Sequence, residues 1–135
     1  MSIKEELNNL KETFMLFEEP KDKFVQLMDM AKQSENLKSS EKIDFNKING
    51  CTSQAWVLAE PNDDGTYTIR ADSDALIVKG LLTILEIIFT NKVVDEILSI
   101  NSEDILYSIG LDNTITSQRT NGFSNAVEKI HGLIR

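Results

Sequence analysis

The first third of the chain has the hydrophobic spacing of two amphipathic helices. Ser2, with Glu5 three residues later, has the form of a capping box at the start of the first helix. Behind it, apolar residues recur at intervals of four and three, which predicts one buried stripe: Ile3, Leu7, Leu10, Phe14 and Phe17. Pro20 suits the first turn of a second helix, whose apolar face is Phe24, Leu27, Met28 and Ala31. We expect the two helices to form a hairpin.

The middle of the chain changes from no period to a period of two. From about Ser34 to Asn46 the residues are polar and aperiodic, which predicts a loop with a short extended piece near Phe45 to Ile48. Two alternating runs then flank a turn at Pro61 to Gly65, which indicates an antiparallel hairpin. In the first run Ala55, Val57 and Ala59 alternate with Trp56 and Leu58. In the second, Tyr67, Ile69 and Ala71 alternate with Thr66, Thr68 and Arg70.

The second half of the chain is helical. A helix that is apolar almost all round runs from Ala75 to about Asn91, and we expect Asp72, Ser73 and Asp74 to cap its start. Short helices are predicted at Val94 to Ile100 and at Ser102 to Ile109, the latter ended by Gly110. A last helix begins near Ser117, with an inner face of Phe123, Ala126, Val127, Ile130, Leu133 and Ile134. Helices, a small antiparallel sheet and further helices predict an α+β fold in one domain, residues 1–135.

Composition narrows the function classes. The formal charge is −8, and no run of Lys or Arg would form the basic face of a nucleic-acid or membrane-surface binder, so neither partner is expected. The start of the chain lacks the apolar region of a signal peptide, and the most apolar stretch contains Lys79 and Glu86. We therefore expect a cytoplasmic protein whose partners are proteins.

Reactive side chains are few. One cysteine, Cys51, excludes an internal disulfide, and one histidine, His131, gives no spacing for a metal site. The segment Asn62 to Gly65 lacks the spacing of a calcium loop. We expect no metal and no cofactor. Position alone favours an inert, buried Cys51, since single cysteines commonly pack as small hydrophobes.

Three segments carry a resemblance to a known family. They are Asn49-Gly50-Cys51-Thr52-Ser53-Gln54-Ala55-Trp56, then Ala71 to Leu81 (ADSDALIVKGL), then Leu111 with Ser117-Gln118-Arg119-Thr120-Asn121-Gly122. Their order and spacing resemble the SufE family of sulfur acceptors, and the likeness weakens over the first forty-odd residues. The family resemblance implies an α+β fold with a small three-stranded antiparallel sheet and helices packed on one face.

The resemblance also implies a role for Cys51. SufE-like proteins take sulfur from the cysteine persulfide of a SufS-like, pyridoxal-phosphate-dependent cysteine desulfurase. They stimulate that enzyme and pass the sulfur to an iron–sulfur assembly scaffold of the SufBCD type. By this likeness Cys51 is the acceptor, in a transfer that resembles thiol–disulfide exchange. Such a protein is a carrier with a covalent intermediate and not a stand-alone enzyme.

Five further residues are candidates for partner binding or loop support: Gly50, Ser53, Asp74, Lys79 and Arg119. Gly50 allows a sharp turn and a close approach of another chain. Lys79 interrupts an apolar helix, but its ammonium can reach solvent. Arg119 is a cation in the first turn of a helix, where the dipole disfavours it, so we expect a carboxylate to hold it, from Asp72, Asp74 or a partner. Trp56, Leu58 and the long helix could wall an apolar cavity around an idle Cys51.

Other functions remain open at this point. The sulfur recipient could be a pathway of tRNA or cofactor thiolation. The domain could instead activate a desulfurase without forming a covalent bond, with Cys51 only packed. A redox sensor that forms a sulfenic acid on Cys51 is a third class.

Overall fold

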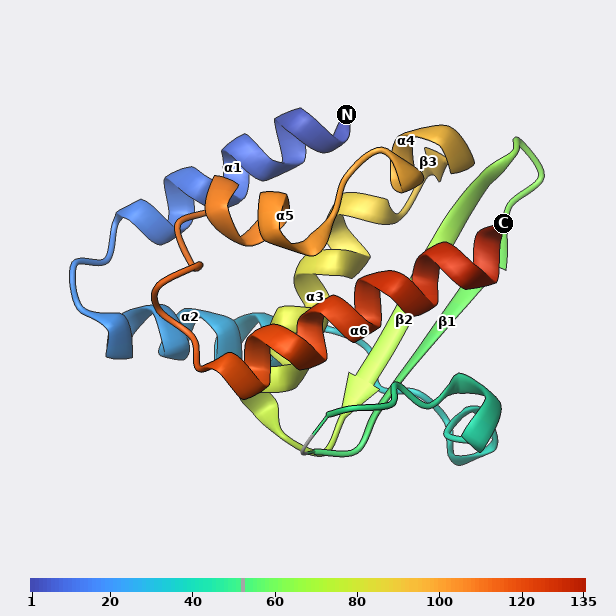
Figure 1. Cartoon of the computed structure of the whole chain (residues 1–135), viewed down its shortest axis with the longest axis horizontal. Helices are drawn as coiled ribbons and strands as arrows, with labels where there is room; N and C mark the ends of the chain where they lie inside the picture. The colour runs from blue at the N-terminus through green and yellow to red at the C-terminus, as the bar shows by residue number, and fades with distance from the viewer. Residues whose placement is uncertain (52) are drawn as a thin grey trace.

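The computed structural model describes residues 1–51 and 53–135, and its helices begin and end close to the predicted positions. Helix α1 spans Ile3–Met15 and opens with the expected capping box, in which Glu5 N–H donates to Ser2 Oγ and Ser2 N–H donates to the Glu5 carboxylate. Helix α2, Pro20–Gln33, has Pro20 in its first turn. The two form a hairpin along one side of the molecule (Figure 1).

The loop that follows contains two short 3-10 turns, η1 (Ser39–Glu41) and η2 (Asp44–Asn46). The extended piece expected near Phe45 to Ile48 is reduced to one isolated bridge between Lys47 and Trp56. A pattern of polar residues without a period does not distinguish such turns from open loop, because each 3-10 turn is closed by only two local hydrogen bonds.

The sheet has the strand order β1-β2-β3 and is antiparallel throughout. Strands β1 (Ala55–Pro61) and β2 (Thr66–Ser73) form the predicted hairpin. The third strand, β3, is only Lys92–Val93, directly after the long helix. Hydrophobic alternation could not reveal it, since two residues are too few to show a period of two. The α+β fold with a three-stranded antiparallel sheet is confirmed.

Helix α3, Leu76–Phe89, is the central element of the core. It packs against β2 on one side and α2 on the other, and α6 (Ser117–Ile134) packs against β1 (Figure 1). Gly80 permits the α2–α3 contact, because a Cβ at this position would lie 2.2 Å from the carbonyl oxygen of Leu27. The sheet face that meets these helices carries Ala55, Val57, Ile69 and Ala71, all buried.

The remaining helices are α4 (Val94–Leu98) and α5 (Ser102–Ser108). Gly110 ends the second of these with a positive φ of 77°, as its position predicts. His131 on α6 is buried and lies 3.0 Å through Nε2 from the carbonyl oxygen of Ile97, so it packs inside the molecule. Over the described residues, every helix is too short or too polar to span a bilayer.

The expected capping of α3 by Asp72, Ser73 and Asp74 is wrong. The helix begins at Leu76, its N-cap is Ala75, and no side chain caps it. Asp72 and Ser73 instead end β2, and Asp74 follows the strand. The Asp72 and Ser73 side chains bond to other segments, Ser73 Oγ also accepts from Ala75 N–H, and Asp74 donates its backbone N–H to Gln54. Those bonds, described below, position the loop around Cys51.

Candidate functional site

Cys51 lies in a short loop between the bridge at Lys47 and the start of β1. Backbone bonds hold the loop at both ends. Ile48 N–H donates to the Ala55 carbonyl at 2.8 Å, and the Gln54 carbonyl accepts from Asp74 N–H at 3.1 Å and from Ser73 Oγ at 2.8 Å. The polar residues before α3 therefore fasten the loop.

Gly50 and α6 shape the path of this loop. Gly50 has a positive φ of 82°, a backbone region that L side chains rarely adopt. A Cβ there would lie 2.2 Å from Nδ2 of Asn125 on α6. The close neighbour is thus a helix of the same chain. Ser53, which the sequence also suggests, is half-buried next to the loop's fixed end.

The Cys51 thiol points into a small apolar cavity between the loop, α3 and α6. The cavity has a volume of about 20 Å³, and among the described residues Gln118 and Arg119 are the polar ones that line it beside Cys51. Its other walls are Val78, Leu81, Leu82, Gly122 and Phe123. The expectation that the long helix forms a wall is confirmed. The expectation for Trp56 and Leu58 is wrong.

Trp56 and Leu58 do not line this cavity because strand alternation turns them to the opposite sheet face from Val57. On that opposite face the Lys42 ammonium lies 5.3 Å from the centroid of the Trp56 ring. The walls that the sequence missed belong to α6. Helical spacing could have suggested that two of them share a face, since Gly122 lies one turn after Gln118.

Burial raises the pKa of the Cys51 thiol. Removal from water disfavours the thiolate, which is the reactive form of cysteine. In the position described, Cys51 is therefore half-buried, protonated at neutral pH and shielded.

Arg119 stands at the wall of the same cavity, in the first turn of α6, where its N–H is capped by Thr116 Oγ1. Its guanidinium lies 5.9 Å from the centroid of the Phe24 ring. Within residues 1–51 and 53–135, no ion pair joins Arg119 to Asp72 or Asp74, so the expectation is wrong for these two acids, while a partner's carboxylate stays a prediction. Asp74 is exposed to solvent, and Asp72 forms ion pairs with Lys42 and Lys79.

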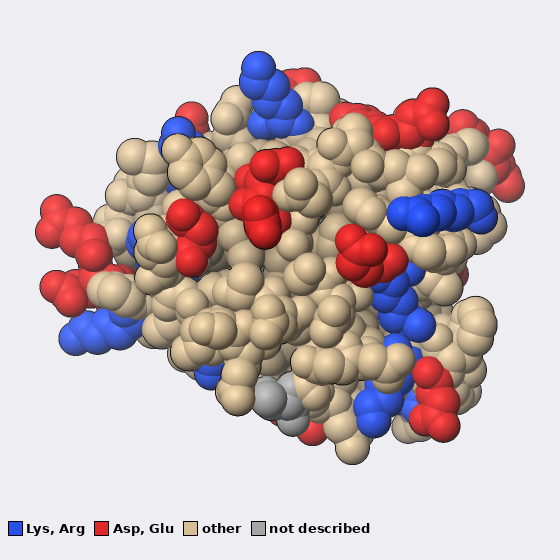
Figure 2. All heavy atoms as spheres, viewed as in Figure 1, with Lys and Arg blue, Asp and Glu red and all other residues tan. Residues whose placement is uncertain are grey.

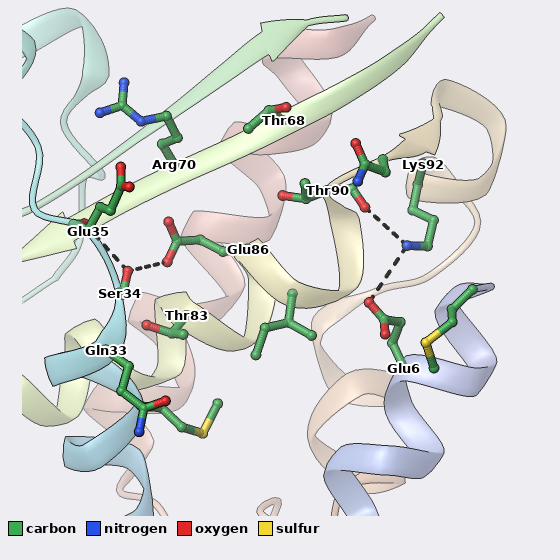
Figure 3. A pocket seen from close by; sticks show the side chains of 14 residues that line it. Glu6, Gln33, Ser34, Glu35, Thr68, Arg70, Thr83, Glu86, Thr90 and Lys92 are labelled. Carbon is green, nitrogen blue, oxygen red and sulfur yellow. Dashed lines mark hydrogen bonds and ion pairs between the residues drawn. The ribbon is translucent and has the colours of Figure 1, made fainter. Parts of the chain in front are cut away.

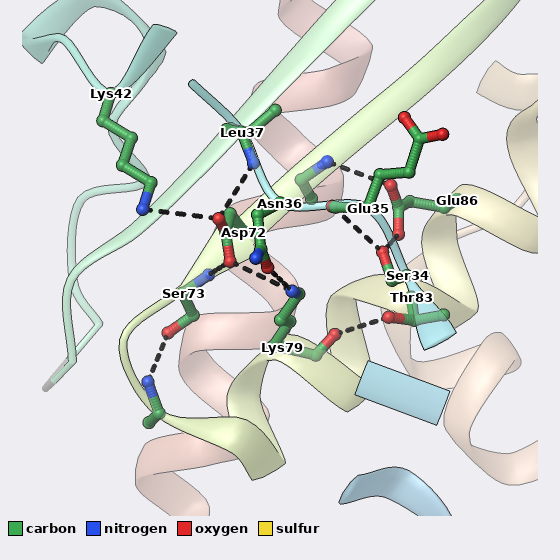
Figure 4. Close-up of polar contacts among 12 residues, drawn as sticks. Ser34, Glu35, Asn36, Leu37, Lys42, Asp72, Ser73, Lys79, Thr83 and Glu86 are labelled. Atoms are coloured by element: carbon green, nitrogen blue, oxygen red, sulfur yellow. Dashed lines mark hydrogen bonds and ion pairs between the residues drawn. The ribbon is translucent and has the colours of Figure 1, made fainter. Parts of the chain in front are cut away.

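Asp72 and Lys79 form the centre of a buried polar cluster (Figure 4). The Asp72 carboxylate lies 3.5 Å from Lys79 Nζ and 3.4 Å from Lys42 Nζ, and it accepts the N–H groups of Leu37 and Ser73. Lys79 also donates to the Asn36 side chain. The ammonium of Lys79 does not reach solvent, contrary to expectation, because only 6% of the residue is exposed.

Charges and hydrogen bonds keep Asp72 ionised. Burial alone would raise the pKa of its carboxyl, but the N–H groups of Leu37 and Ser73 and the charges of Lys79 and Lys42 outweigh that cost. The pKa of Asp72 therefore lies below its usual range. The cluster ties the segment before η1 to β2 and α3, so it supports the loop region and lies outside the cavity.

A larger cavity, of about 710 Å³, opens elsewhere, between the end of α2, α3 and β2 (Figure 3). Glu86 stands at its wall and accepts from Ser34 Oγ at 2.7 Å and from Ala71 N–H at 3.2 Å. Burial raises the pKa of this carboxyl, although both hydrogen bonds oppose the shift. The cavity is lined by acids, bases and hydroxyls of mixed kind and does not include Cys51.

Comparison with known proteins decides the family. The sequence model of the SufE family, described as an Fe-S metabolism associated domain, matches residues 8–134. The chain belongs to the SufE family. Its role is accordingly in iron–sulfur metabolism, as a sulfur acceptor.

Individual relatives agree with this membership. An uncharacterized SufE-like protein of Rhizobium meliloti (strain 1021) is 31% identical over 92% of this SufE-family chain and 91% of its own length. SufE-like protein 1, chloroplastic/mitochondrial, of Arabidopsis thaliana is 34% identical over 90% of this chain, which spans 33% of that longer protein. A solution structure of a hypothetical protein from Thermus thermophilus shares the fold, with a TM-score of 0.78, 16% identity and coverage of 96% and 93% of the two chains.

Side chains that could ligate a metal form no cluster in the described part of the chain. Among the described residues, no group of three or more His, Cys, Asp and Glu side chains has the arrangement of a metal site. Among the described residues, the polar groups at the cavity are one thiol, the Gln118 amide and the Arg119 guanidinium, in an otherwise apolar surrounding.

Proposed function

We propose that Cys51 accepts a sulfur atom from the persulfide of a cysteine desulfurase and passes it to an iron–sulfur assembly scaffold. One observation carries the proposal: the only thiol of a SufE-family chain lies in a tethered loop and points into an apolar cavity with little spare room. SufS-like and SufBCD-like proteins are the partners that we propose for the two steps.

The transfer balances without a cofactor. The Cys51 thiolate attacks the outer sulfur of the donor persulfide, a new S–S bond forms at Cys51, and the donor S–S bond breaks. The electron pair of the broken bond leaves on the donor cysteine as a thiolate. The proton given up by Cys51 balances the proton that this thiolate takes up, and no net oxidation occurs. One acceptor cysteine is therefore sufficient.

The cavity explains how the cargo is protected. A water-sized particle needs a free volume of roughly 10–15 Å³, and the cavity beside Sγ offers about 20 Å³. The outer sulfur of a Cys51 persulfide would fill that space, away from oxidants and free thiols. Because burial raises the pKa of the idle thiol, we propose that Cys51 leaves the cavity to react and returns when loaded.

The compartment follows from the same chemistry. A carrier that must keep its thiol and persulfide intact between partners needs a reducing environment. We propose the cytoplasm, and fractionation of cells with an antibody against the chain would test it.

The deciding experiment mixes the purified chain with a SufS-like desulfurase and cysteine. Mass spectrometry of the peptide that contains Cys51 should show the mass of one added sulfur atom. Cys51→Ser should gain no sulfur and should not stimulate cysteine turnover. Full stimulation by Cys51→Ser would sink the covalent proposal and favour an activating adaptor, whereas sulfenic acid without persulfide would favour a redox sensor.

The recipient needs a separate test. Loaded chain, freed from desulfurase and cysteine, should transfer labelled sulfur to a SufBCD-like scaffold. If the label instead reached only a tRNA- or cofactor-thiolating enzyme, the scaffold step would be wrong while the acceptor role of Cys51 would stand.

A further inference from the structure

A second pocket borders the cysteine loop. It lies further along α6 than the apolar cavity, towards the C-terminal end of that helix. It has a volume of about 360 Å³ and is lined by Lys47, Asn49, Gly50, Asn125 and Lys129, which we call the basic pocket. Gly50 lines this pocket and Cys51 lines the apolar cavity, so consecutive loop residues border both spaces. Whatever occupies the basic pocket therefore lies next to the reacting thiol.

The charge in this pocket is uncompensated. Lys47 and Lys129 are half-buried basic side chains, and none of the five lining residues is acidic. Within the described part of the chain, neither lysine forms an ion pair, and the Lys129 ammonium lies 5.6 Å from the centroid of the Phe45 ring. In contrast, Arg70, Lys79 and Lys92 each have a carboxylate within 4.0 Å.

The other polar groups of the pocket are hydrogen-bond donors or can act as donors. Nδ2 of Asn125 lies directly against Gly50, and Asn49 presents a second exposed side-chain amide. An ionised carboxylate has only acceptor oxygens, so it binds where ammonium and amide N–H groups can donate hydrogen bonds to it. The chemistry of the pocket therefore selects an anion.

We propose that the basic pocket binds an Asp or Glu side chain of the protein that exchanges sulfur with Cys51. This inference rests on the proposed function, because a persulfide can reach Cys51 only on a partner whose surface covers the neighbouring Gly50. A partner's side chain is therefore brought to the pocket by the reaction itself. The pocket also opens widely to solvent, so a small free anion would keep most of its water there.

Charge complementarity supports a protein partner with an acidic contact surface. The chain carries a net charge of −8, so it repels acidic surfaces over most orientations. Figure 2 shows several basic side chains, with acidic ones among them, down one side of the molecule, where the same view in Figure 1 has the C-terminal half of α6 and the loop with η1 and η2. An acidic partner is thereby oriented with its carboxylate towards this side, which contains Lys129.

The first test measures docking at different salt concentrations. The double variant Lys47→Gln/Lys129→Gln keeps a polar, hydrogen-bonding side chain at each position and removes both charges. With a purified SufS-like desulfurase and cysteine, the chain concentration for half-maximal stimulation should rise about fivefold at low ionic strength, and the difference should vanish at high salt. Turnover at saturating chain should stay unchanged. Equal half-maximal concentrations at low salt would overturn the proposal.

A matched control carries Lys11→Gln/Lys32→Gln, which removes two exposed charges from α1 and α2. It changes the net charge by the same amount, but at positions that do not line the basic pocket, so it should leave the half-maximal concentration unchanged. An equal rise in this control would show a long-range charge effect and would overturn the assignment to the basic pocket. Circular dichroism melting confirms that both double variants fold.

A second test does not depend on sulfur transfer. Titration of the isotope-labelled chain with the peptide acetyl-Glu-Glu-Glu-amide should shift the backbone amides of Asn49, Gly50 and Asn125, and the double variant should lose these shifts. Absence of the shifts, or equal shifts with acetate at the same carboxylate concentration, would overturn the proposal. If Cys51 gains no sulfur in any variant, the proposed function fails separately, and this titration still decides whether the pocket binds a protein carboxylate.

Discussion

Gly122 on α6 lies directly against Cys51: a Cβ at Gly122 would be 2.9 Å from Sγ. Side-chain atoms do not approach so closely, so a larger residue at this position and the thiol cannot both keep their places. The thiol therefore occupies its cavity because this turn of α6 lacks a side chain.

Gly122→Ala should expose the thiol. The added methyl group displaces Sγ towards solvent, which removes the desolvation that raises the pKa of Cys51. We expect the pH midpoint of Cys51 alkylation to fall and the rate at neutral pH to rise several-fold. Alkylation rates measured across pH report both quantities.

Gly132→Ala is the control for Gly122→Ala. Gly132 lies on the same helix, and a Cβ there would meet nothing within 4 Å. Replacement of a helical glycine by alanine stabilises by about 1 kcal/mol, so Gly132→Ala should raise the melting temperature and leave alkylation unchanged. Equal alkylation profiles for wild type and Gly122→Ala would contradict the role of Gly122.

Gly50→Ala should lower the unfolding free energy more than Gly65→Ala, the same substitution in the turn between β1 and β2. Gly50 and Gly65 have nearly equal positive φ angles, 82° and 85°, but only a Cβ at Gly50 would meet Asn125. The shared backbone strain costs about 1–2 kcal/mol, so Gly65→Ala should lose that amount of unfolding free energy. Gly50→Ala should lose more and should slow sulfur loading of Cys51. Urea unfolding and persulfide mass spectrometry check the two effects, and equal losses would rule out the Asn125 contact.

Asp72→Asn should be strongly destabilising. It removes the carboxylate that compensates the buried Lys79 ammonium, and breaking a buried ion pair from one side costs about 3–5 kcal/mol. Lys79→Met removes the buried cation and leaves Asp72 with Lys42 and two N–H donors, so it should cost less. Urea unfolding of the two variants gives the comparison, and a larger loss for Lys79→Met would contradict the predicted order.

The Asp72 carboxylate should also make the unfolding free energy depend on pH in the acidic range. Because the pKa of Asp72 is lowered in the folded state, its contribution is complete above the unfolded-state value of about 4. It is lost as pH falls through the lower folded-state pKa. Wild type should therefore lose more unfolding free energy than Asp72→Asn in this acidic range. Parallel losses in the two proteins would show that Asp72 is not responsible.

Glu86→Gln should not destabilise the protein at neutral pH. Burial raises the pKa of Glu86, so its stabilising contribution declines as pH rises from the unfolded value of about 4.3 through the folded value. A glutamine can still accept from Ala71 N–H and can donate to Ser34 Oγ. We expect an equal or higher unfolding midpoint at pH 7. Glu86→Ala, which loses both contacts, should cost about 1–3 kcal/mol, and an equal loss for Glu86→Gln would contradict this account.

The sequence allowed most helices and the hairpin to be predicted, because their residues repeat at the period of the element. The buried stripe of α1 and the alternation in β1 are examples. Contacts between segments far apart in the sequence have no such period. The two-residue strand β3, the Asp72–Lys79 pair and the placement of Gly122 against Cys51 depend on how finished elements pack together.

Candidate residues divide in the same way. Cys51 could be selected because it is the only thiol in the sequence. Gly50 could be selected because glycine allows a sharp turn of the backbone, which depends on that residue alone. The partner of Arg119 could not be predicted: the dipole argument favoured a carboxylate, but the structure places the Phe24 ring beside its guanidinium. Lys47, Asn125 and Lys129 were missed because they meet only after α6 packs beside the loop.

The two fixed ends of the cysteine loop set a limit on where sulfur can be delivered. Ile48 is bonded to Ala55, and Gln54 is bonded to Ser73 and Asp74, which leaves the stretch from Asn49 to Ser53 between the two anchors. Such a stretch has a contour length of about 17 Å, and a loop held at both ends reaches out by about half of that. The travel of the thiol is thus shorter than the width of a helix with its side chains. We therefore expect a donor or recipient to bring its reactive sulfur atom within that distance of the cysteine loop, at the edge of α6.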